Sequence, residues 1–119
     1  MYHISIPFTT DGSGNFNTTI PKGGNPQETL IYEVGFHGAN LTGGTAALTQ
    51  TNTPYGFNIT LLNLAAANVT KVFLPRVAEQ DTSGVDGSGR LLQSLVGDLN
   101  FVLSGAGANK SGKVVITVI

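Results

Sequence analysis

Apolar and polar residues alternate along most of this chain, and this pattern constrains the fold more than any other feature of the sequence. The first segment shows it clearly: Tyr2, Ile4, Ile6 and Phe8 fall on one side of an extended chain, and the residues between them fall on the other. Only a β-strand places every second side chain on one face. We therefore expect half-buried strands rather than helices.

Clusters of Gly, Asn, Asp and Pro divide the pattern into short segments. Their spacing is typical of sandwiches and barrels, and no segment of helical length has a 3.6-residue period. We therefore predict one all-β domain over residues 1–119, an antiparallel β-sandwich of about eight strands with jelly-roll or immunoglobulin-like topology. The expected strands are residues 2–9, 16–20, 28–37, 45–51, 57–64, 69–77, 90–96, 99–104 and 113–119, where 90–104 is either two strands or one bulged strand.

Some segments allow finer expectations. In the strand 28–37, Leu30, Tyr32, Val34 and Phe36 should form the apolar face. Residues 78–89 should form the longest loop, because they combine glycines with three of the seven acidic residues. The motif Asp-Gly-Ser-Gly occurs at 11–14 and again at 86–89, which predicts two similar turns.

The last strand, 113–119, is apolar on both sides, so it should lie in the centre of a sheet or be covered by a partner. Pro7 and Pro75 interrupt strand patterns and should lie at sheet edges or bulges, because proline cannot donate a ladder hydrogen bond.

Composition restricts the classes of partner. The 119 residues include no Cys, only 11% are charged, and the net charge is -1; ordinary soluble domains carry roughly 25% charged residues. The six basic residues are scattered, so nucleic acid and anionic membranes are not expected partners. No apolar run approaches the ~20 residues of a transmembrane helix. The chain opens directly in a strand pattern without a basic leader, which predicts synthesis in a cytoplasm.

No catalytic or metal-binding constellation stands out, so we expect no enzyme activity and no cofactor. His3 and His37 are the only histidines, and His37 lies about 13 Å along a strand from Glu33, too far to share an ion. The acidic segment 79–86 is rich in oxygen ligands but lacks the spacing of a helix–loop–helix calcium site, which leaves calcium binding open. No serine lies in a Gly-x-Ser-x-Gly turn between a strand and a helix.

Two segments are candidates for binding a partner. Residues 1–6 form either a contact arm, since a terminal strand can add to a neighbouring sheet, or an ordinary strand of the domain itself. Tyr55 lies in a Pro-Tyr-Gly turn and is the best aromatic platform for a sugar. The candidate partner-binding residues are Tyr2, Ile4, Ile6 and Tyr55.

The chain resembles the small structural proteins of tailed-bacteriophage virions, in particular head decoration (cement) proteins. The resemblance lies in the cysteine-free, weakly charged β-pattern as a whole, in the stretch Leu-Ile-Tyr-Glu-Val-Gly-Phe at 30–36, and in the closing Gly-Lys-Val-Val-Ile-Thr-Val at 112–118. It implies a non-enzymatic domain, made in the host cytoplasm and located in the virion, that bridges neighbouring capsid subunits.

The partners implied by this resemblance are the major capsid protein or other virion proteins, and further copies of the chain in a dimer or trimer. Neither nucleic acid nor membrane is among them. Two other functions stay open: a carbohydrate- or receptor-binding module of a fibre, and a head–tail connector or tail component.

Overall fold

The computed structural model describes residues 2–22 and 29–119, and these residues contain ten strands and no helix. The all-β prediction is therefore confirmed. The first residue of the predicted strand 28–37 lies outside the described residues. The strands are β1 (Tyr2–Thr9), β2 (Phe16–Ile20), β3 (Leu30–His37), β4 (Thr45–Thr51), β5 (Ile59–Leu64), β6 (Thr70–Phe73), β7 (Arg76–Gln80), β8 (Asp86–Ser94), β9 (Asp98–Ser104) and β10 (Ser111–Val118).

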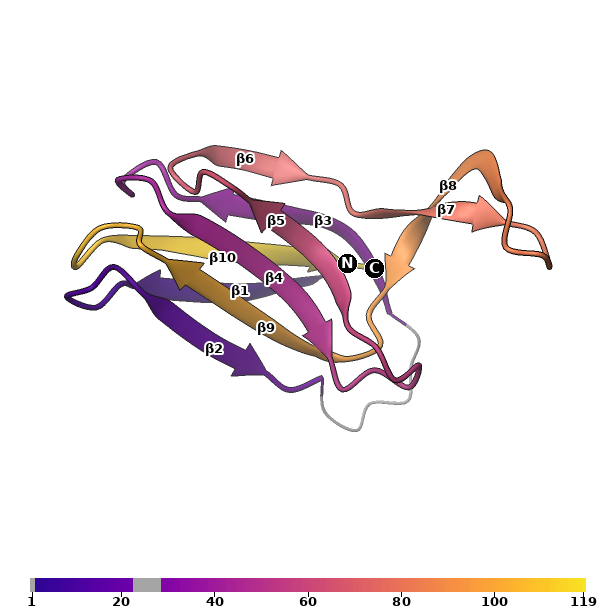
Figure 1. Cartoon of the computed structure of the whole chain (residues 1–119). Helices are drawn as coiled ribbons and strands as arrows, with labels where there is room; N and C mark the ends of the chain where they lie inside the picture. The colour runs from indigo at the N-terminus through magenta and orange to yellow at the C-terminus, as the bar shows by residue number, and fades with distance from the viewer. Residues whose placement is uncertain (1, 23–28) are drawn as a thin grey trace.

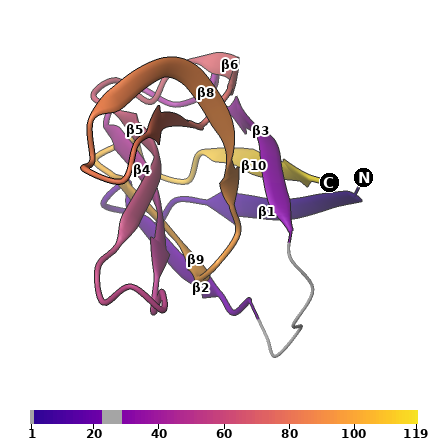
Figure 2. The ribbon, with the colours of Figure 1, turned by 90° about the vertical axis from the view of Figure 1, so that its right-hand side faces the viewer.

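The strands form two antiparallel sheets that pack face to face as a β-sandwich (Figure 1). The larger sheet has the order β1-β10-β3, and the far side of β3 is shared by β6 and β8. Strand β7 pairs with β8 and completes this six-stranded sheet. The smaller sheet has the order β2-β9-β4-β5. Figure 2 shows the two layers from the side on which the β7–β8 hairpin projects.

The connectivity selects the jelly roll from the two predicted topologies. Without β7 and β8, the sheet orders are β1-β10-β3-β6 and β2-β9-β4-β5, and the chain changes sheet at every connection except β4–β5. Eight strands wound between two sheets in this way form a jelly roll. In an immunoglobulin sandwich, by contrast, several hairpin-connected strands lie side by side in one sheet. The β7–β8 hairpin is an insertion between the sixth and seventh strands of the jelly roll.

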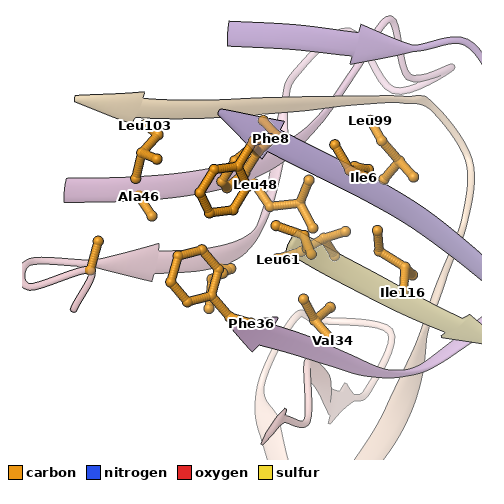
Figure 3. Packing of buried hydrophobic residues seen from close by; sticks show 14 of the residues in the cluster. Ile6, Phe8, Val34, Phe36, Ala46, Leu48, Leu61, Leu99, Leu103 and Ile116 are labelled. Carbon is orange, nitrogen blue, oxygen red and sulfur yellow. The ribbon is translucent and has the colours of Figure 1, made fainter. Parts of the chain in front are cut away.

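Phenylalanine side chains from both sheets meet at the centre of the sandwich. Phe8, Phe16, Phe36 and Phe101 come from β1, β2, β3 and β9, and their ring centroids lie 5.6 to 6.2 Å apart. Figure 3 shows two of these rings among the aliphatic side chains of both sheets. Burial of such residues stabilises each by roughly 1.5–3 kcal/mol relative to exposure, so this cluster joins the two layers.

Strand β10 lies in the centre of the larger sheet, between β1 and β3, as its two-sided apolar pattern predicted. Its inward residues Val114, Ile116 and Val118 are fully buried. Pro7 lies on β1, an edge strand of the same sheet, and Pro75 lies between β6 and β7. Pro7 is therefore on an edge strand, where its missing N–H costs no bond to a further strand, and Pro75 lies outside the strands.

The predicted apolar face of β3 is wrong in its first half. Ile31 is fully buried and Tyr32 is 41% exposed, because the register between β3 and β10 shifts opposite Thr117 and Val118. One extra residue in a strand exchanges the two faces beyond it. Alternation alone could not locate this bulge.

The predicted loop 78–89 is also wrong, because most of it is a hairpin whose turn covers only residues 81–85. The Asp81 carboxylate accepts hydrogen bonds from the backbone N–H groups of Ser83 and Val85 and so closes the turn. Asp11 makes the same two bonds to Ser13 and Asn15. The structural repeat is therefore Asp-x-Ser-Gly at 11–14 and 81–84, whereas the second Asp-Gly-Ser-Gly motif lies inside β8.

Candidate functional site

The β7–β8 hairpin extends beyond the sandwich as an arm (Figures 1 and 2). It joins the rest of the larger sheet only at its base, where Leu30 pairs with Ser94 and Ile31 with Gln93. No residue in the range 68–94 is buried. This part of the chain nevertheless carries five exposed large apolar residues, namely Val72, Leu74, Val77, Val85 and Leu91.

One side of the base of the arm is held by Arg76. Its guanidinium donates to the backbone carbonyls of Tyr32 at 2.8 Å and Pro75 at 2.9 Å. It also lies over the Tyr32 ring, 5.5 Å from the centroid, a favourable cation–π position. The planar guanidinium thus attaches the start of the arm to β3 by two contacts, both with Tyr32.

The other side of the base is held by Gln50, a fully buried polar residue of β4. Its Nε2 donates to the Ser94 carbonyl at 2.9 Å, and its Oε1 accepts from the N–H groups of Val96 at 2.7 Å and Gly97 at 3.1 Å. These three bonds satisfy backbone groups at the point where the chain leaves β8 and crosses to the smaller sheet. The direction of the arm is therefore fixed at both of its strands.

The tip of the arm is acidic. Residues 79–89 contain Glu79, Asp81 and Asp86 and no basic residue. Asp81 is engaged in the turn, and Asp86 accepts a hydrogen bond from the Gln80 side chain at 2.7 Å. Val85, which is 62% exposed, lies in the turn beside Asp86. The tip thus presents an apolar side chain among carboxylates.

A basic groove lies on the outer face of the larger sheet, at the end opposite to the arm. Gly35 on β3 is paired with Val115 on β10 and Val72 on β6, and because it has no side chain the sheet is hollowed between the two valines. The resulting groove has a volume of about 350 Å³. The described residues that line it include no acid and three basic residues, His37, Lys71 and Lys113.

The next row of the same face holds the other histidine. His3 Nδ1 lies 2.9 Å from the Thr117 hydroxyl, which lies 3.5 Å from Glu33 Oε1. Thr117 is almost fully buried, so this chain of polar groups joins three strands. Within residues 2–22 and 29–119, no three His, Asp or Glu side chains are grouped to hold a metal ion, and this includes the acidic segment 79–86.

Two carboxyl groups have a lowered pKa, and both lie away from the arm and the groove. The backbone N–H groups of Asn15 and Ser13 lower the pKa of Asp11. The Asn52 amide and the Lys22 N–H lower the pKa of Asp98, with hydrogen bonds of 2.8 and 3.0 Å. Hydrogen bonds to the charged form favour it in each case.

The predicted partner-binding residues do not form one surface. Ile6 is 3% exposed and packs in the core, and Ile4 packs partly against it. Tyr2 is exposed on the edge strand β1, and the described residues 2–6 are an ordinary part of the sandwich's own sheet. Tyr55 is exposed and stacks on Phe57 with ring centroids 5.8 Å apart.

The arm and the groove were not predicted. The apolar residues at 72, 74, 77 and 91 fall within the expected strands 69–77 and 90–96, but a strand pattern does not say whether the chain itself covers its apolar face. The groove comes from three strands that are distant in sequence. One sequence signal was available: Gly35 interrupts a strand face between Glu33 and His37, and glycine within a strand often marks a close approach.

Comparison with protein-family models finds no match, and comparisons with curated protein sequences and with solved structures find no significant similarity. Over residues 2–22 and 29–119 there is no helix with the length and hydropathy needed to cross a membrane.

Proposed function

We propose that this protein is a non-enzymatic structural protein of a virus particle, of the head-decoration type, that binds an assembled capsid and stabilises it. The observation that carries this proposal is the arm. Apolar residues such as Val77 and Leu91, which pair across β7 and β8, face solvent on a hairpin whose base is held by Arg76 and Gln50.

An isolated two-stranded hairpin is marginally stable in water. Exposed apolar patches of this kind commonly mark interaction sites. A segment without a single buried residue, whose direction is nevertheless fixed, is suited to insertion against another protein. The low charge of the chain also suits docking, because charged residues are depleted at the cores of protein interfaces.

The fold adds weaker support. Jelly rolls occur in viral capsid domains, but also in lectins and enzymes, so the fold alone assigns no function. The proposed mechanism is simple: each bound copy buries area across neighbouring capsid subunits, and the lattice is stabilised by mass action because the protein binds only the assembled form. Many symmetric copies multiply a modest affinity per site.

The test uses purified particles that lack the protein, incubated with the wild-type chain and with a Val77→Asp and Leu91→Asp double variant, and then sedimented. We expect the wild type to sediment with the particles and the arm variant to lose at least about tenfold in affinity, the effect of roughly 1.4 kcal/mol. A control with Thr60→Asp and Asn63→Asp, which adds two charges at exposed positions of β5, should bind normally. Wild-type protein that stays in the supernatant, or that is located at a fibre tip or on the tail axis, would refute the proposal.

A second function, carbohydrate or receptor binding, is favoured by one observation. Tyr55 and Phe57 are 58% and 64% exposed and stack on each other. Beside them lies a depression of about 280 Å³ lined by Asn52, Thr53 and Asn58 among others. Aromatic faces next to amide groups are suited to stacking on a sugar ring. Binding to immobilised oligosaccharides that is lost with Tyr55→Ala and Phe57→Ala would support this function in place of capsid attachment.

A further inference from the structure

We propose that the acidic tip of the β7–β8 arm, residues 79–89, docks in the basic groove of a second copy of this chain. The proposal concerns contacts between copies and does not rest on capsid attachment. The occupant of the groove is a second copy of the chain, because the acidic and apolar groups that complement the groove are found on the arm.

Charge is the first argument. The chain has only six Lys and Arg residues and seven Asp and Glu residues, and acids outnumber bases at the tip whereas bases outnumber acids in the groove. Two lysines and a histidine line the groove without an acid among the described lining residues. Three acids lie in residues 79–89, against the one base beside them, Arg90, whose guanidinium donates to the Gly87 and Gly89 carbonyls. Such complementarity steers association and selects the partner.

The apolar surfaces are the second argument. The floor of the groove is formed by Val72 and Val115 on either side of Gly35. The tip of the arm offers Val85, exposed in the turn and adjacent to Asp86. An apolar knob with carboxylates beside it thus meets an apolar floor with Lys113 and His37 beside it. Docking would remove from water the exposed valines of both surfaces.

Position is the third argument. The arm projects from one end of the larger sheet, whereas the groove is formed at the other end, where β3 finishes and β6 and β10 begin (Figure 1). The molecule is 48 Å long. The arm therefore points away from the groove of its own chain, and the contact must form between copies. The copies then form either a reciprocal pair, in which each copy gives and receives an arm, or a closed ring.

The test is a charge exchange read by sedimentation velocity at low ionic strength. The groove variant carries Lys71→Glu and Lys113→Glu, and the arm variant carries Glu79→Lys and Asp86→Lys; Asp81 is left in place because it closes the turn. We expect wild type to self-associate as its concentration rises from about 1 μM to about 1 mM, and each variant alone to associate at least about tenfold more weakly. An equimolar mixture of the two variants should associate as wild type does, because each then offers the surface that the other needs.

The mixture separates lost charge from lost folding, since an unfolded variant cannot be rescued by its counterpart. All four positions are exposed, so both variants should retain the wild-type circular dichroism spectrum. If either does not, the Lys→Gln and Glu/Asp→Gln or Asn versions of the same positions replace it. Lys110→Glu, a basic position outside the groove, is the matched control and should leave association unchanged.

Any of three results would overturn the proposal: the wild type stays monomeric at about 1 mM, the variants associate normally, or the mixture of variants does not recover wild-type association. Attachment to particles is measured separately, so loss of self-association with intact particle binding refutes this inference and leaves the proposed function standing. The reverse result refutes the proposed function alone.

Discussion

The sandwich and the β7–β8 arm are built from the same kinds of residue, yet they use them in opposite ways. In the sandwich, alternating apolar residues such as Ile6 and Phe8 meet a facing sheet and are buried. In the arm, Val77 and Leu91 also lie on paired strands, but both face solvent. The comparison teaches that alternation specifies a strand, whereas the topology decides whether the chain itself covers the apolar face.

The largest expected difference between the two regions is in stability. Phe101→Ala should lower the free energy of unfolding by about 3–5 kcal/mol, because it opens a cavity where four phenylalanine rings meet. Leu91→Ala on the arm should change it by no more than about 0.5 kcal/mol, because Leu91 buries little in the monomer. Chemical denaturation of dilute protein measures both values. A loss for Leu91→Ala close to that for Phe101→Ala would show that the arm is part of the folding core.

The second prediction concerns the junction between the two regions. Gln50→Leu should lower the free energy of unfolding by about 2–4 kcal/mol, since it leaves the Ser94 carbonyl and the Val96 and Gly97 N–H groups without their partner. Gln80→Leu is the matched control on the arm, where the amide bonds only the exposed Asp86 and the effect should be below about 0.5 kcal/mol. Equal effects of the two substitutions in denaturation would contradict the role given to Gln50.

A smaller effect is expected at the other anchor. Arg76→Gln should cost about 1 kcal/mol or less in stability, because the guanidinium is only partly buried. It should nevertheless increase hydrogen exchange in β7 and the second half of β8, since the start of the arm is no longer held to Tyr32. Arg90→Gln should not have this effect, because Arg90 bonds only the carbonyls of Gly87 and Gly89 within the arm. Unchanged exchange in the Arg76 variant would show that the arm does not depend on this contact.

The smallest effect is the pH dependence of the sandwich loops. The pKa values of Asp11 and Asp98 are lowered in the folded protein. Each carboxylate therefore contributes stability above its unfolded pKa, near 3.9, and that contribution is lost as the pH falls through the lower folded value. The melting temperature should fall below about pH 4, and less steeply in the Asp11→Asn and Asp98→Asn variant, whose amides keep an acceptor oxygen without titrating. Melting curves that fall equally in both proteins would contradict this assignment.

The sequence predicts the sandwich well where a residue's surroundings follow from its neighbours in the chain. The two-sided apolar pattern of 113–119 correctly predicted a central strand, and the position of Pro7 correctly predicted an edge. The bulge at Tyr32 was missed because it depends on the register with a strand more than 80 residues away. Gln50 was missed because a glutamine between two threonines is typical of a solvent-facing strand, whereas three backbone groups of the β8–β9 crossing make this one buried.

The candidate surfaces could be predicted only in part. Tyr55 is exposed in its turn and Tyr2 at the start of β1, whereas Ile6 belongs to the core because the smaller sheet covers it. The hairpin was read as a loop because Asp-Gly-Ser-Gly at 86–89 is typical turn chemistry, while the turn forms five residues earlier around Asp81. The groove could not be predicted, because it depends on the register between three strands that are distant in sequence, and no local pattern contains that register.

Hydrogen exchange of the wild-type protein, followed from dilute to concentrated solution, tests most directly the claim that the sandwich folds by itself and offers its arm to a second copy. Amides in β4, β9 and β10 should exchange slowly at every concentration. Amides in residues 79–89 and 70–72 should exchange quickly when dilute and become protected together as concentration rises. Slow exchange of the arm in dilute solution, or an arm that stays unprotected while other surfaces become protected, would contradict it.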